Sequence, residues 1–68
     1  MTRLKINGVE EEVAAATVAQ LLVTQGIDPM ARFLAVAVNG AVVRRAEWPS
    51  RPLAVGDDVE IVRPLQGG

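Results

Sequence analysis

Hydrophobic and polar residues alternate with a period of two along several short stretches of the chain, and this pattern predicts strands. Residues 3–6 alternate in this way, Asn7-Gly8 is a strong two-residue hairpin signal, and residues 9–13 return as a second strand. The chain is therefore predicted to begin with a hairpin. Strict alternation would place Glu11 on the core face, so we expect a bulge or an early end to this strand instead of a buried carboxylate.

The pattern changes to a helical period after the first hairpin. Thr17 offers an N-cap, and Gln20 follows three residues later as its capping-box partner. The residues at the i, i+3, i+4 spacing of one helical face are Val18, Leu21 and Leu22. A helix of two to three turns is predicted, and because this length is marginal in isolation, its apolar stripe must pack on a sheet.

The end of this helix is equally well marked. Gly26 suits the left-handed position that ends a helix, and Ile27 can pack back as the hydrophobic contact beyond the cap. Asp28-Pro29 prevents the helix from continuing.

A second hairpin is predicted further along the chain. Residues 33–38 are continuously apolar but alternate in size, which favours a strand inside the sheet, and Asn39-Gly40 signals a tight turn into residues 41–43. With Leu34, Val36 and Val38 facing the helix, the opposite face carries small side chains and can receive a partner. The candidate docking residues are Phe33, Ala35, Ala37, Val62 and Arg63. The alternative is an ordinary strand buried on both sides.

The remaining elements complete a known layout. Residues 44–52 lack a sheet pattern and predict a short helical turn, with Trp48 as a packing anchor at the core edge. Gly56-Asp57-Asp58 predicts a turn, and residues 59–62 predict a last strand that ends at Pro64. Two hairpins around one helix, followed by a final strand, predict an α+β fold of the ubiquitin-like β-grasp type.

In that fold a mixed sheet of four to five strands carries one main helix packed on one face and a free C-terminal tail. We expect residues 1–64 to form the β-grasp domain and residues 65–68 to form a flexible diglycine tail. The final strand is expected at the centre of the sheet, beside the first.

Composition narrows the possible chemistry. The chain has 68 residues, half of them hydrophobic, and contains no Cys and no His. It therefore lacks a thiolate nucleophile and the commonest metal ligand, so we expect no bound metal or cofactor. Its four Ser and Thr residues have no His or Cys to activate them, which excludes the usual hydrolase triads. We expect a protein that other enzymes act on, and not an enzyme.

Charge and hydropathy point to a cytoplasmic protein. The net charge is −1, and a single Trp and a single Phe offer little for stacking on bases, so no nucleic-acid partner is expected. No run approaches the roughly 20 apolar residues of a membrane span, and no secretory signal is recognisable. The acidic run Glu10-Glu11-Glu12 is interpreted as a solvated strand edge.

The sequence ends at Gly67-Gly68, two residues without side chains. On a chain so poor in reactive side chains, a glycine carboxylate on a flexible tip is a suitable group for another enzyme to modify. Extended, residues 65–68 span roughly 13 Å, at about 3.3 Å each, which is long enough to enter the cleft of another protein.

The order and spacing of several of these features resemble the ThiS family, the sulfur carriers of thiamin thiazole synthesis. The resemblance covers the full chain and is carried by Val36-Ala37-Val38-Asn39-Gly40, Val43, Arg45, Trp48, Gly56-Asp57 and Gly67-Gly68. Arg44 departs from the pattern, because a proline is expected there in this family. An arginine at this position would change either the local edge of the sheet or a contact with a partner. It does not alter the C-terminal residues.

The resemblance implies a route by which sulfur is carried on Gly68. A ThiF-type adenylating enzyme would consume ATP to adenylate the Gly68 carboxylate, and sulfur from a cysteine desulfurase or another persulfide source would replace AMP. The resulting thiocarboxylate would donate its sulfur to a ThiG-type thiazole synthase.

The resemblance also implies roles for the tail. Gly67 would lie against a narrow channel because it lacks a Cβ, Pro64 would stiffen the exit, and Leu65 and Gln66 would set the depth of insertion. Leu65 can equally be a core plug at the sheet edge, and Arg63 can be an ordinary solvated charge instead of a contact with the adenylating enzyme.

Three alternatives remain open at this point. The small subunit of molybdopterin synthase, a sulfur carrier for the molybdenum cofactor, shares the fold and the diglycine end. A ubiquitin-like modifier would form an isopeptide bond through Gly68, and a plain β-grasp interaction module would have an inert tail.

Overall fold

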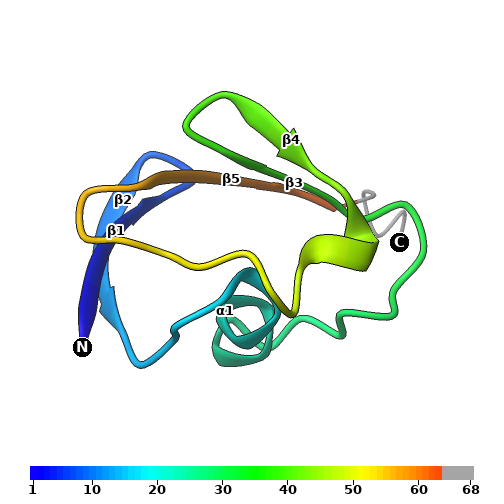
Figure 1. Cartoon of the computed structure of the whole chain (residues 1–68), viewed down its shortest axis with the longest axis horizontal. Helices are drawn as coiled ribbons and strands as arrows, with labels where there is room; N and C mark the ends of the chain where they lie inside the picture. Colours follow the sequence, from blue (N-terminus) through cyan, green and yellow to red (C-terminus); the bar gives the residue numbers. More distant parts are fainter. Residues whose placement is uncertain (64–68) are drawn as a thin grey trace, which may run out of the picture.

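Five strands form one mixed sheet with a single α-helix against it in the computed structural model, which describes residues 1–63. In chain order the elements are β1 (Thr2–Ile6), β2 (Val9–Val13), α1 (Val18–Thr24), β3 (Ala35–Val38), β4 (Ala41–Val43), the 3-10 helix η1 (Arg45–Glu47) and β5 (Asp58–Val62). The strand order is β2-β1-β5-β3-β4, with β5 parallel to β1 and the other neighbours antiparallel. The predicted β-grasp layout, with its last strand at the centre, is confirmed. Figure 1 shows α1 beneath the sheet.

The first hairpin forms as predicted, but the expected distortion of its second strand is wrong. β1 and β2 pair without interruption from Thr2 opposite Val13 to Ile6 opposite Val9, and Glu11 lies directly across from Leu4. Leu4 is buried, whereas Glu11 is only half-buried. Because β2 is an edge strand, the Glu11 carboxylate reaches water past the open side of the sheet, so the ladder needs no bulge.

A reciprocal cap begins α1. The Thr17 hydroxyl accepts a hydrogen bond from the Gln20 backbone N–H at 3.3 Å, and the Gln20 side-chain oxygen accepts one from the Ala16 N–H at 2.8 Å. The predicted capping residues are confirmed, with the return bond one residue earlier than the usual box.

Across residues 1–63, no helix is both long enough and apolar enough to span a membrane.

The predicted end of α1 is also confirmed. Gly26 has a φ of +74°, and its N–H donates to the Val23 carbonyl at 3.0 Å. The Ile27 N–H donates to the Leu22 carbonyl at 2.9 Å, which completes a Schellman motif, and the Ile27 side chain is buried in the core. The motif turns the chain back under the sheet and starts the loop that leads to β3.

The core lies between α1 and the facing side of the sheet. The predicted stripe of α1, formed by Val18, Leu21 and Leu22, is completely buried there. Trp48 closes one side of the core at 2% exposure, and its indole N–H donates to the Val43 carbonyl at 2.9 Å, which confirms the predicted anchor. Each large aliphatic side chain buried in this layer contributes about 1.5–3 kcal/mol.

The second hairpin differs from the prediction at its start. β3 begins at Ala35, whereas the apolar pattern predicted extended chain from Phe33. Phe33 has a φ of +60°, a left-handed conformation that interrupts the strand. Leu34, Val36 and Val38 face the core as expected.

The asparagines of the two Asn-Gly turns also hold β5 in place. The Asn7 side-chain oxygen accepts a hydrogen bond from the Ile61 N–H at 2.8 Å, beyond the point where β1 has turned away. The Asn39 side-chain oxygen accepts one from the Asp58 N–H at 2.9 Å. Both asparagines have positive φ, 49° and 53°, which this residue tolerates better than most. Each turn residue therefore also completes the hydrogen bonding of the central strand.

Substitution at Asn7 tests this arrangement. Asn7→Gly accepts the turn conformation but leaves the Ile61 N–H without its acceptor, so we expect a loss of about 1–3 kcal/mol in the free energy of unfolding. Asn7→Asp keeps an acceptor at the same place and should lose less than half as much. Urea unfolding followed by circular dichroism measures both variants, and equal stability of the two would refute the role of the side-chain oxygen.

Candidate functional site

The last described residues carry the chain away from the middle of the sheet. β5 finishes at Val62, which pairs with Ala35 at the start of β3, and Arg63 follows. In Figure 1 this end of β5 lies on the right, beside the loop that precedes β3. The predicted tail residues lie outside the described residues; they are Pro64, Leu65, Gln66, Gly67 and Gly68. The surface around the end of β5 is therefore the described part of the candidate site.

One half of the uncovered sheet face is apolar and surrounds the end of β5. We call it the open-face patch, and it consists of Ala35, Ala37, Val42 and Val62. Val42 is 80% exposed and Val62 is 60% exposed, although both are aliphatic. Together with Glu60 these side chains line a shallow depression of about 140 Å³. Three of the five predicted docking residues thus lie together on a surface that α1 does not cover.

The other two predicted docking residues lie at a second feature, which we call the tail-root hollow. Phe33 and Arg63 line it together with Asp28, Arg32 and neighbouring residues of the loop after α1. The hollow measures about 360 Å³ and lies where α1 ends and β3 begins. Alternation had predicted that Phe33 shares the sheet face with Ala35, but the left-handed backbone at Phe33 places it against this hollow instead.

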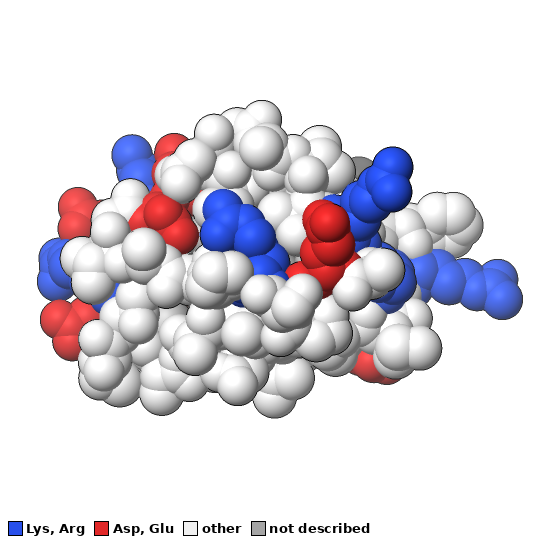
Figure 2. Space-filling model, in the orientation of Figure 1, with Lys and Arg blue, Asp and Glu red and all other residues white. Residues whose placement is uncertain are grey.

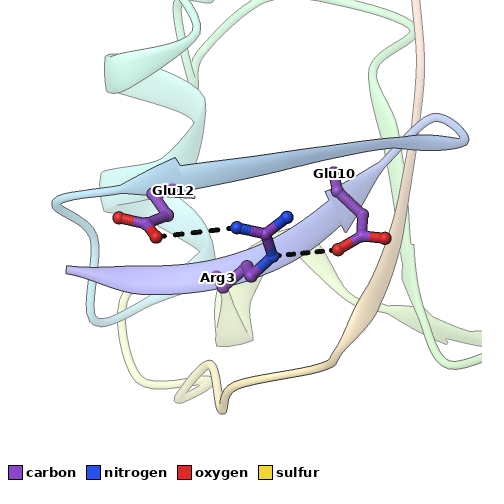
Figure 3. Close-up of polar contacts among 3 residues, drawn as sticks. All are labelled: Arg3, Glu10 and Glu12. Atoms are coloured by element: carbon purple, nitrogen blue, oxygen red, sulfur yellow. Dashed lines mark hydrogen bonds and ion pairs between the residues drawn. The ribbon is translucent and has the colours of Figure 1, made fainter.

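The opposite half of the uncovered face is charged and internally paired. Arg3 on β1 donates from its Nε to Glu10 at 2.9 Å, and its Nη1 lies 3.6 Å from Glu12 (Figure 3). The hydrogen bond to Glu10 is the main cause that raises the pKa of the Arg3 guanidinium. The acidic run is indeed a solvated edge, as predicted, and β1 partly neutralises it. These exposed pairs contribute little stability, but they make this half unlike the open-face patch.

The Asp57-Asp58 turn is structural. One Asp57 carboxylate oxygen accepts from the Ala54 N–H at 2.9 Å, and the other accepts from the Asn39 side-chain amide at 3.0 Å. Both oxygens of the Asp57 carboxylate are thus occupied in holding the predicted turn together. Among residues 1–63, no three His, Cys, Asp or Glu side chains gather where they could hold a metal ion.

Sequence reasoning assigned no individual role to two arginines at the loop after α1. Arg32 lines the tail-root hollow, and Arg45 donates to the carbonyls of Pro29 and Ala31 in the same loop. The Arg45 guanidinium also lies 4.6 Å from the centre of the Trp48 ring. A three-residue spacing between Arg45 and Trp48 is compatible with stacking on a helical turn, but nothing in the sequence indicates which carbonyls the arginine reaches.

Comparison with known proteins identifies the family. The model of the ThiS family matches residues 4–68. The crystal structure of the thiamine biosynthesis protein (ThiS) from Geobacter metallireducens is similar with a TM-score of 0.78 and 28% identity, and the match covers 98% of this chain and 100% of that one. The solution NMR structure of a thiamine biosynthesis protein from the same organism gives the same score and identity, with 88% of its chain covered. A search of curated proteins found no match. On the strength of the family match and the shared fold, this chain belongs to the ThiS family.

Proposed function

We propose that this protein is the sulfur carrier of thiamin biosynthesis and that it carries sulfur as a thiocarboxylate on Gly68. The observation that supports this most strongly is the ThiS family match, which extends through Gly67-Gly68 to residue 68. The fold is compatible with the role, because the chain leaves the sheet from its central strand and the last residues follow directly.

The chemistry requires activation before sulfur can be added. A carboxylate is a poor electrophile, since its charge is delocalised and its oxygen leaves badly. A ThiF-type adenylating enzyme would join the Gly68 carboxylate to AMP from ATP and release pyrophosphate. The terminal sulfur of a cysteine persulfide would then attack the carbonyl carbon, and AMP would leave.

The sulfur then has to be freed from its donor. A second thiol would attack the sulfur atom that belongs to the donor cysteine. The S–S bond would break, the two donor-side thiols would be joined as a disulfide, and the thiocarboxylate would remain on Gly68. A ThiG-type thiazole synthase would receive this sulfur. The route needs no cysteine on the carrier, in agreement with a sequence that has none.

The open-face patch is a suitable docking surface for these enzymes. Its aliphatic side chains are exposed and adjoin the end of β5, from which the tail continues. An enzyme that accepts Gly68 has to lie close to Val62, so burying the patch would add apolar contact to the recognition of the tail. Arg63 would contact the same enzymes at the rim.

The first test is the intact mass of the protein after incubation with ATP, a ThiF-type enzyme, a cysteine desulfurase and cysteine. We expect a mass gain equal to the exchange of one oxygen for one sulfur, and no gain for a chain from which Gly68 is deleted. A covalent ladder on other proteins would indicate a modifier instead. An unchanged mass, or sulfur acquired by the deletion variant, would refute sulfur carriage on Gly68.

The second test concerns Gly67. Gly67→Ala adds a Cβ and restricts the backbone next to the reacting carbonyl, so we expect adenylation to slow by at least about tenfold, equivalent to about 1.4 kcal/mol. Pyrophosphate exchange measures the rate. Val9→Ala, at an exposed position on β2 to which the proposal gives no role, serves as the control, and equal rates for the two variants would contradict the channel interpretation.

The third test concerns the open-face patch. Ala35→Glu places a charge beside Val62 and should raise the KM of the adenylating enzyme for the carrier about tenfold without unfolding the domain. Ala35 is preferable to Ala37, because Ala37 pairs with Glu60 and a second carboxylate there would repel it.

Val23→Glu, at an exposed position on α1, is the matched control and should leave KM unchanged. Unfolding of the Ala35→Glu variant, seen by circular dichroism, would place Ala35 in the core and contradict the docking role.

A further inference from the structure

Arg45 connects η1 to the loop that follows α1. Its two terminal guanidinium nitrogens donate to two carbonyls of that loop, those of Pro29 and Ala31. The guanidinium is stacked 4.6 Å from the centre of the Trp48 ring, and Trp48 is itself buried and hydrogen-bonded to Val43. The planar guanidinium of Arg45 therefore rests on the buried indole of Trp48 while it bonds the loop. This arrangement fixes the position of the loop relative to the core.

The same loop exposes the phenyl ring of Phe33 on a strained backbone. Phe33 has a φ of +60° and is 81% exposed. The left-handed region is strained for a bulky residue, and an exposed ring regains little of this strain energy by burial. The surrounding structure must therefore hold the conformation, and the Arg45 bond to Ala31 lies only two residues upstream.

Phe33 lies where an enzyme that takes the tail must approach. It shares the tail-root hollow with Arg63, the residue after β5. Five further residues lead to Gly68 and span at most roughly 17 Å, so an active site that holds Gly68 keeps its enzyme within that reach of Arg63.

The charge of the hollow favours an acidic partner surface. Among the described residues that line it, Arg32 and Arg63 are basic and Asp28 is acidic, and Asp28 accepts a hydrogen bond from the Met30 N–H at 2.9 Å. In Figure 2 basic side chains project at the right-hand end of the molecule, where Figure 1 places the loop before β3 and the end of β5.

We propose that Arg45 is a positioning residue: it fixes the loop so that Phe33 projects at the root of the tail and inserts into an acidic-rimmed apolar site on the adenylating enzyme. This inference rests on the proposed function and adds a specificity contact to it. The guanidinium of Arg45 acts through the loop and does not itself contact the enzyme.

Two substitutions in the full chain separate positioning from charge. Phe33→Asn removes the phenyl ring while keeping a residue that tolerates the left-handed backbone, so the fold should be retained with an equal or higher Tm. Arg45→Lys keeps the positive charge but cannot donate in a planar fork to two carbonyls. The matched controls are Met30→Asn, at an exposed apolar position in the same loop, and Arg3→Lys, at an exposed arginine on the charged half of the sheet.

Pyrophosphate exchange with a ThiF-type enzyme, measured against carrier concentration, gives KM and kcat. We expect Phe33→Asn and Arg45→Lys each to raise KM about tenfold with kcat within about twofold of the unsubstituted chain, and the controls to change neither. The double variant should be no worse than Phe33→Asn alone, because both substitutions remove the same contact.

The outcomes are distinct from those of the proposed function. Lack of any exchange with the unsubstituted chain would refute that function itself. With exchange present, an unchanged KM for Phe33→Asn or for Arg45→Lys, an effect on kcat instead of KM, or additive effects in the double variant would overturn the positioning role. Unfolding of Arg45→Lys at the assay temperature would assign Arg45 to stability and overturn it equally.

Discussion

The central position of β5 is the constraint on which the rest of the structure depends. β5 pairs in parallel with β1 and antiparallel with β3, so it joins two hairpins that are otherwise separate halves of the sheet. Asn7 and Asn39 add side-chain hydrogen bonds to it from either side. With Val59 completely buried against the core, this strand is a rigid base for whatever follows Arg63.

The two faces and two halves of the sheet have different tasks. One face packs on α1 and supplies the free energy that a domain of this size needs. On the other face, the β1–β2 half is covered by paired charges that discourage association, whereas the half around the end of β5 is apolar and exposed. The apolar half of this face is therefore the half around the end of β5.

Local signals explain why most of the fold could be predicted. Both Asn-Gly turns, the Thr17–Gln20 cap and the Gly26 terminus depend on neighbouring residues alone, and the structure confirms each of them. Glu11 was misjudged because a strand pattern does not reveal whether the strand lies at the edge of the sheet, where a carboxylate remains in water. Phe33 was misjudged because apolarity predicted extended chain where the backbone is left-handed.

Local sequence signals also predicted part of the candidate site. Ala35, Ala37 and Val62 were found from alternation, which a strand obeys locally, and the structure places them on one surface. Arg45 was known only as part of a family pattern, because its partners Pro29 and Ala31 lie on a different segment and only the folded chain brings them together.

The position of β5 also has a consequence for biosynthesis. During translation both hairpins and α1 leave the ribosome before the strand that unites them, so the domain cannot close until its last strand has been made. A chain that stops before β5 would leave β1 and β3 without the strand that pairs with both of them.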